Sequence, residues 1–286
     1  GQPLLQGRSL PRWMLELEHE FRVVDVHVRL EPDESRRPDG RIGDPETIER
    51  EMHQAGVVRS VVFPGPRDGS YLKVNNAVAR MSVGRSFVAF ARINGARDAG
   101  SSPGARLRNL ASSREDHHTS PEDVEQYAYD DRFAGFKLHP AADGLPDEEV
   151  LEQLADVGLP VLVHAGRQFP PRAVADHLLD YEFPVIVEHF GGYPLDRELI
   201  ADGIALLDRW ESCFLDTSFV RFRTPLERAI MEHPDRICFG SGAPATHPDV
   251  GLMEILTLDV PEDAMRKVFS KNPSRVVPEL SSSGGE

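Results

Sequence analysis

The sequence predicts a (β/α)8 TIM barrel, and three observations lead to this fold class. Short runs rich in valine, isoleucine and phenylalanine alternate with helical patterns along the chain. Eight such runs, each followed by a helix, occupy about 250 residues, the usual size of this barrel. The main alternative, a doubly wound open sheet, would normally carry a glycine-rich turn after its first strand. The corresponding turn here, EPDESRRPDG, has no GxGxxG motif.

Each expected strand is an apolar run, which is the pattern of buried parallel strands. The runs cover residues 22–30, 57–64, 86–93, 133–139, 159–165, 183–190, 212–218 and 236–241. The expected helices cover residues 45–55, 71–83, 121–128, 147–157, 172–180, 196–210, 225–233, 248–257 and 261–270. Several of them begin with Asp, Ser or Pro, which are N-terminal signals. The stretch 95–120 is rich in Gly, Ser and Arg, and we expect a loop or lid there.

Length and composition indicate one large domain, because 286 residues of which 40% are hydrophobic can bury a sizeable core. We expect an N-terminal extension over 1–20, a single barrel over 21–280 and a flexible tail over 281–286. No apolar run is long enough for a membrane span, and the first residues lack a signal-peptide pattern. The sequence therefore predicts a cytoplasmic protein.

The net charge of −15 argues against nucleic acid and anionic membranes as partners. The two cysteines, Cys213 and Cys238, lie in apolar runs, and we expect buried, reduced thiols rather than a disulfide framework. Charge therefore excludes two classes of partner, and the cysteines carry no predicted function.

Polar residues gather where the expected strands end, which is where such barrels carry their chemistry. These strand ends hold His27, Lys137, His139, His164, His189, Asp216 and Ser218. In the first strand, side chains should alternate between faces, so Asp25, His27 and Arg29 are expected to share one face. Four histidines at four strand ends predict a functional pocket, because imidazoles can bind a metal or move protons near neutral pH.

Seven motifs, in order from residue 23 to 277, resemble the amidohydrolase superfamily. They are DVHVRL, GFKLHP, LPVLVHAG, PVIVEHFGG, FLDTS, RICFGSGAP and NPSRVV. More narrowly they resemble the branch that includes aminocarboxymuconate semialdehyde decarboxylase and lactone or amide hydrolases. The resemblance implies a hydrolase or a decarboxylating lyase, acting on a small carboxylate or carbonyl compound. It also implies one divalent metal, zinc first among them, and a homodimer.

The resemblance also assigns roles to individual residues. His27 and His164 match metal ligands of the first and fifth strands, and His189 matches the general acid or base of the sixth strand. Two positions depart from the family pattern. The second histidine of the first-strand His-x-His is Arg29, and the eighth-strand aspartate is Gly242. Half of the usual ligand set is therefore missing.

Our first hypothesis is a metal-independent enzyme. Arginine cannot bind a cation, because it is permanently charged and has no acceptor atom. Arg29 would then occupy or border the metal position and bind a carboxylate, phosphate or oxyanion. His189 would move protons, and Lys137 or His139 would assist.

Asp216 and Ser218 complete the expected site as substrate contacts. Arg29 and Lys137, in a protein of net charge −15, indicate a small anionic ligand.

Two alternatives stay open. In one, a metal binds through His27, His164 and His189, with His139 or Asp216 as the substitute ligand, since three histidines suffice for a catalytic zinc site. In the other, the barrel has lost catalysis and serves as a small-molecule binder or a partner subunit.

Overall fold

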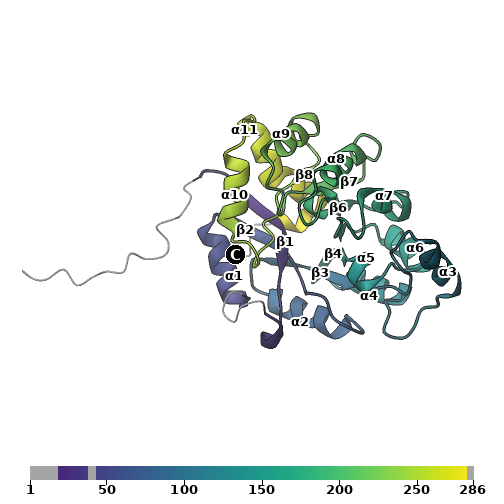
Figure 1. The fold of residues 1–286 in the computed structure, drawn as a ribbon. Helices are drawn as coiled ribbons and strands as arrows, with labels where there is room; N and C mark the ends of the chain where they lie inside the picture. Colours follow the sequence, from purple (N-terminus) through teal and green to yellow (C-terminus); the bar gives the residue numbers. More distant parts are fainter. Residues whose placement is uncertain (1–18, 38–42, 282–286) are drawn as a thin grey trace, which may run out of the picture.

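Figure 1 shows the computed structural model of the chain, which describes residues 19–37 and 43–281. The extension predicted over 1–20 and the tail predicted over 281–286 lie almost wholly outside the described residues, so these boundaries stay predictions. None of the helices in the described ranges is long and apolar enough to cross a membrane.

Eight parallel strands form one sheet, in which every strand pairs with its neighbours in chain order. They are β1 (Val23–Arg29), β2 (Val57–Phe63), β3 (Phe87–Ile93), β4 (Phe133–Leu138), β5 (Val161–Val163), β6 (Val185–Val187), β7 (Cys213–Asp216) and β8 (Ile237–Cys238). The segment after β8 returns to β1, where Arg29 N donates to Ala243 O at 2.8 Å and Gly242 N donates to His27 O at 3.0 Å. The predicted TIM barrel is confirmed.

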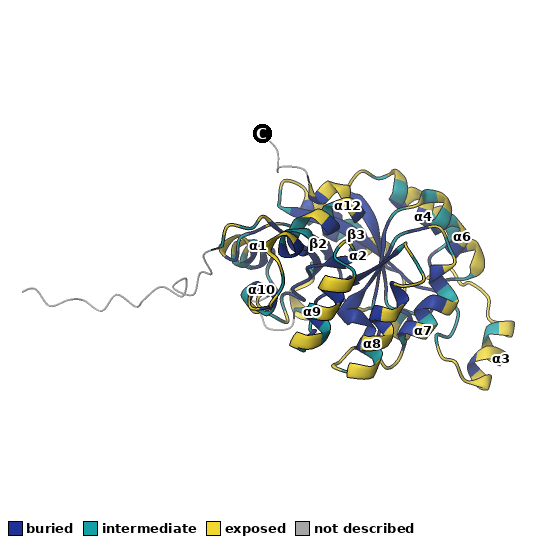
Figure 2. Ribbon diagram, turned by 90° about the horizontal axis from the view of Figure 1, so that it is seen from above, coloured by how far each residue is buried: buried dark blue, intermediate teal, exposed yellow. Residues whose placement is uncertain are grey.

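Helices surround the strands when the barrel is seen from above (Figure 2). They are α1 (Pro45–Gln54), α2 (Leu72–Ser82), α3 (Pro103–Ala111), α4 (Pro121–Tyr129), α5 (Pro140–Asp143), α6 (Glu148–Val157), α7 (Pro171–Val174), α8 (Arg197–Leu206), α9 (Arg223–Glu232), α10 (Pro248–Leu256), α11 (Glu262–Arg266) and α12 (Asn272–Val276). The side chains of Asp44, Ser120 and Asp147 each accept a hydrogen bond from a first-turn amide, as the sequence signals predict.

The stretch 95–120, expected as a loop or lid, contains the nine-residue helix α3, which was not predicted from the sequence. Ser102 accepts a hydrogen bond from Ala105 N, and Pro103 occupies the first turn. These start signals were present, but α3 buries only Ala105, so it has no apolar stripe that periodicity could detect.

Two apolar layers form the core. An inner cluster fills the barrel and includes Val24, Val26, Leu162 and Ile186. A larger outer cluster lies between the strands and the helices and includes Val28. Both cysteines are buried and free, as predicted. Membership of the two clusters shows which face each strand residue occupies.

A β-bulge in β1 changes the face on which its side chains lie. Asp25 pairs with Ser60 and Val28 with Val62, so one strand advances three residues where the other advances two. Val24 and Val26 face the interior, whereas Val28 faces the helices. His27 therefore turns inward, and Asp25 does not share its face. The expectation of one common face for Asp25, His27 and Arg29 is wrong for Asp25.

Candidate active site

A buried ion pair lies at the centre of the carboxyl-terminal ends of the strands. The Lys137 ammonium, from β4, contacts Glu188 Oε2 directly after β6, and each side chain is 1% exposed. The Phe63 ring lies 4.6 Å from Lys137 Nζ and closes one side of the pair. Burial lowers the pKa of Lys137, and Glu188 counteracts it. Burial would raise the pKa of Glu188, but Lys137 and His27 hold that pKa well below its usual value.

The other oxygen of Glu188 faces three imidazoles. Its Oε1 lies 3.4 Å from His27 Nε2, 3.7 Å from His164 Nδ1 and 3.8 Å from His189 Nε2. Glu188 was not among the site residues predicted from the sequence. The sequence contained the signal for it. Glu188 lies two residues after Ile186, which faces the barrel interior, and residues two apart in a strand share a face.

His27 is oriented by a buried carboxylate. Its Nδ1 lies 2.7 Å from Asp216 Oδ2, and Asp216 is fully buried at the end of β7. Burial lowers the pKa of His27, but Glu188 and Asp216 outweigh it and raise that pKa. Because the carboxylate accepts the proton on Nδ1, the Nε2 atom points to Glu188.

His189 reaches the centre because its backbone is left-handed, with φ 60° and ψ 27°. This conformation is uncommon for a residue with a side chain, and such strain is typical of functional sites. His189 Nδ1 donates to the carbonyl of Ser218 at 2.9 Å, which fixes the tautomer and leaves Nε2 as an acceptor. Burial lowers the pKa of His189 to about 3, and His27 adds to this effect, so its imidazole is neutral near pH 7.

Asp216 and Ser218, expected as substrate contacts, have partners within the protein. The Ser218 hydroxyl contacts Asp216 Oδ1 and lies 2.9 Å from His189 Nδ1. Both residues are buried. Asp216 contacts His27 and Ser218 contacts His189, and their expected role as substrate contacts stays a prediction.

The donor atoms at this centre fit a divalent cation. One ligand atom from each of His27, Glu188 and His189 lies within 4.8 Å of the others. Both imidazoles carry their proton on Nδ1, where a carboxylate or a carbonyl accepts it, and this is how metal-binding histidines are usually held. The set shares only His27 with the ligands that the resemblance implies. His164 lies beside this group, and His189 belongs to it.

His139 and His164 form a stacked pair next to the ion pair. Their ring centroids are 4.0 Å apart and their planes differ by 9°. His139 Nδ1 accepts a hydrogen bond from Ala142 N at 3.2 Å, which fixes the ring at the start of α5. Burial, with help from His164 and Lys137, lowers the pKa of His139 to about 3. On the other side of the pair, the Tyr193 ring lies 4.8 Å from that of His164.

Arg29 lies at the rim of the barrel, where its side chain is 36% exposed. Its Nη2 lies 3.4 Å from Glu31 Oε2 and 3.4 Å from the carbonyl of Arg36. Glu31 also contacts the guanidinium of Arg67. The structure therefore pairs Arg29 with Glu31 rather than with the histidine cluster, and replacement of a metal by Arg29 stays a prediction.

Gly242, which stands where the family has an aspartate, adopts a φ of +75°. A Cβ atom there would lie 2.8 Å from the ring of Phe219. Backbone and neighbour both exclude a ligand side chain at this position without rearrangement.

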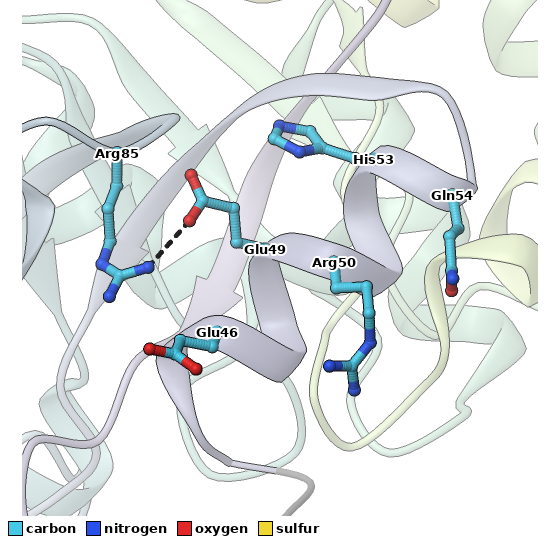
Figure 3. A pocket seen from close by; sticks show the side chains of 6 residues that line it. All are labelled: Glu46, Glu49, Arg50, His53, Gln54 and Arg85. Carbon is cyan, nitrogen blue, oxygen red and sulfur yellow. Dashed lines mark hydrogen bonds and ion pairs between the residues drawn. The ribbon is translucent and has the colours of Figure 1, made fainter.

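A separate hollow on α1 lies away from these residues (Figure 3). Its side chains are Glu46, Glu49, Arg50, His53, Gln54 and Arg85. Glu49 accepts hydrogen bonds from Arg85 Nη1 at 2.8 Å and from Ser86 N at 2.9 Å. Arg85 and Ser86 precede β3, so this hollow lies toward the amino-terminal ends of the strands. Such barrels carry catalysis at the opposite end.

The barrel and its histidine centre define an amidohydrolase-type protein. The sequence matches the amidohydrolase family over residues 24–278, and the chain belongs to this family. The predicted resemblance is confirmed. No curated protein matches the sequence.

Solved structures share the fold at low sequence identity. An uncharacterized TIM-barrel protein of Bordetella bronchiseptica has a TM-score of 0.64 and 18% identity, over 91% of this chain and 100% of that chain. The 2,6-dihydroxybenzoate decarboxylase from Rhizobium has a TM-score of 0.62 and 14% identity, over 91% of this chain and 98% of that chain. A manganese-bound 5-carboxyvanillate decarboxylase of Novosphingobium aromaticivorans has a TM-score of 0.59 and 11% identity, over 91% of this chain and 97% of that chain.

Proposed function

We propose that this protein is a hydrolase or decarboxylating lyase that acts on a small carboxylate or carbonyl compound. The observation that carries the proposal is the convergence of three imidazoles on Glu188 Oε1, beside the buried Lys137 ammonium. A purely structural core would not gather these groups at one end of the barrel, because their burial is costly. The decarboxylases among the similar structures support the substrate class.

In this proposal a divalent cation, zinc or manganese, is held by His27, Glu188 and His189. When bound, such a cation polarises a carbonyl or carboxylate group and acidifies water. Asp216 and the carbonyl of Ser218 keep the two imidazoles in the binding tautomer. Lys137 neutralises Glu188 and leaves a net positive centre that favours an anionic substrate.

His164, stacked on His139, transfers a proton to or from the substrate. His164 is 15% exposed, whereas His189 is 4% exposed, so a substrate at the mouth reaches His164 more readily. Burial lowers the pKa of His164, although Glu188 opposes this, so its neutral form can accept a proton. His139 stacks on this ring and limits its rotation. The proposed roles of His164 and His189 are thus exchanged relative to the family pattern.

Arg29 binds the substrate carboxylate at the rim. Its guanidinium is partly exposed, and its contacts to Glu31 Oε2 and to the carbonyl of Arg36 are both long, at 3.4 Å, so it can turn toward a ligand. A guanidinium binds a carboxylate through two parallel hydrogen bonds, which orients the substrate.

The experiment combines metal content with turnover. Purified protein is dialysed against trace zinc and manganese and analysed by elemental mass spectrometry. A panel of small aromatic carboxylates and lactones is then assayed for CO2 release and for hydrolysis. The same measurements are made on His189→Ala and His164→Ala, with His53→Ala on α1 as the matched control.

We expect about one cation per chain in the wild type and in His164→Ala. His189→Ala loses the cation, and both centre variants lose turnover, whereas His53→Ala behaves as the wild type. Full activity in His164→Ala, with loss only in His189→Ala, would contradict this assignment and make His189 the general acid or base. A folded protein that binds carboxylates but converts none of the panel favours the binding-module alternative.

A further inference from the structure

We infer that the hollow between α3 and α7 is a second binding site, for a small ligand with two or more anionic oxygen groups. The hollow has a volume of about 930 Å³ and lies beside the barrel mouth, between the segments after β3 and after β5. Both segments lie on the same side of the barrel (Figures 1 and 2). Its charged lining is Arg97, Arg106, Arg167, Arg172 and Asp176, together with His177.

The charge of this lining is the reverse of the charge of the whole protein. The described lining contains four arginines and one aspartate, whereas the whole chain carries a net charge of −15. Arg172 lies 3.8 Å from Asp176, and Arg167 lies 3.3 Å from Asp196. Within the described residues, Arg97 and Arg106 have no carboxylate within ion-pair distance. Two guanidinium charges are thus left for a ligand.

The position of Arg97 is fixed by its backbone. Arg97 N donates to Leu145 O at 3.1 Å, and Leu145 N donates to Arg97 O at 2.8 Å. Arg97 is half-buried, and Arg97 and His177 both line the hollow. Burial lowers the pKa of His177, and the charge of Arg97 adds to this effect.

The helix that carries Arg106 is held against the same segment. Asn109 Oδ1 accepts from Asp98 N at 2.6 Å, and Asn109 Nδ2 donates to Asp98 O at 2.9 Å. These two bonds join α3 to the residue that follows Arg97. The two unpaired arginines thus belong to one connected structure, which favours a preformed site over a chance meeting of surface charges.

The chemistry of the lining selects the ligand. Guanidinium groups bind phosphate or carboxylate oxygens through paired hydrogen bonds, and Gln168 adds a neutral donor. A neighbouring hollow shares Arg97, Asn109 and Gln168 and continues to Pro140, directly after His139. The site therefore lies next to the proposed catalytic centre but uses none of its residues. This inference does not depend on the proposed function.

The test is isothermal titration calorimetry of the full chain with inorganic pyrophosphate and, separately, with citrate, at low and high sodium chloride. The variant is Arg97→Gln/Arg106→Gln. The matched control is Arg223→Gln/Arg228→Gln on α9, which removes the same charge from arginines paired with Glu227 and Glu232. Circular dichroism melting confirms that each variant is folded.

We expect saturable one-to-one binding that weakens at high salt, at least tenfold weaker in Arg97→Gln/Arg106→Gln and unchanged in the control. Tighter binding of pyrophosphate identifies a phosphate ligand, and tighter binding of citrate a polycarboxylate. Equal weakening in both double variants, or no saturable binding to the wild type, overturns the inference.

If the double variant does not fold, Arg106→Gln alone replaces it, because Arg106 is exposed. A threefold or greater loss of affinity in that variant is expected, and unchanged affinity rejects the site.

Discussion

Asp216 Oδ2 and His27 Nδ1 lie 2.7 Å apart at the carboxyl-terminal end of the barrel, and the carboxylate has no exposure to solvent. Burial alone would raise the pKa of Asp216, yet His27 holds that pKa below its usual value. The carboxylate is therefore ionised when His27 donates to it. This contact decides which nitrogen of His27 faces Glu188.

Replacing this carboxylate should weaken cation binding without unfolding the protein. For Asp216→Asn we expect zinc affinity to fall about 10–100-fold, the usual effect of losing a carboxylate behind a ligating histidine. Competition with a chromophoric chelator measures the affinity, and the exposed Asp208→Asn serves as control. Unchanged zinc affinity in Asp216→Asn would show that His27 does not bind the cation through Nε2.

Separating the buried ion pair should cost much stability. We expect Lys137→Met to lower the free energy of unfolding by about 3–5 kcal/mol, because Glu188 would stay charged without its partner. The double variant Lys137→Met/Glu188→Gln should recover most of this loss. Urea unfolding of the two single variants and the double variant gives the coupling energy. Purely additive single losses would show that the two groups do not act as a pair.

Gly242 should not accept a side chain. For Gly242→Ala we expect a loss of about 1–3 kcal/mol, because the residue is left-handed and its new Cβ would meet the Phe219 ring. Thermal melting measures the loss, and Gly69→Ala is the control, since it shares the positive φ but has no atom within 4 Å. Equal losses in the two variants would assign the whole effect to backbone strain. The same clash predicts that Arg29→His/Gly242→Asp will not bind zinc more tightly than the wild type.

Glu254 should make stability depend on pH. Burial raises the pKa of Glu254 from 4.5 to about 7, against the smaller opposite effect of Arg221. A raised pKa penalises the ionised folded state, so the penalty is complete above pH 7, shrinks as pH falls and is absent below 4.5. We expect Glu254→Gln to stabilise the protein at pH 8 by on the order of 1 kcal/mol, after allowance for solvent screening.

Urea unfolding at pH 8 and pH 4 measures this dependence, with the exposed Glu232→Gln as control. The gain should vanish at pH 4. A gain of equal size at both pH values would show that loss of charge is not its cause.

The fold was predictable because hydrophobic alternation and helix start signals are local. All eight strands lie within their predicted ranges, and the nine expected helices appear. The two helices expected over 172–180 and 261–270 begin as α7 and α11 and continue as the π-helical segments Ala175–Leu179 and Lys267–Lys271. The inward position of Glu188 was also predictable, because it lies two residues after the inward-facing Ile186. The predicted site was nevertheless built on the histidines. The inward position of His189 was not predictable, because a strand residue three positions after the inward-facing Ile186 should lie on the outer face. Only a left-handed backbone, fixed by tertiary contacts, brings it inside.

The bulge in β1 has a consequence for comparing this chain with its relatives. Between Asp25 and Val28 the strand contains one more residue than its partner. Counting back from His27 by strict alternation would therefore equate Asp25 with an inward residue of an unbulged relative. Deleting Val26 would remove the extra residue and leave plain alternation, with Asp25 outward and His27 inward. The extra residue is thus what lets two consecutive side chains, Val26 and His27, face the interior of the barrel.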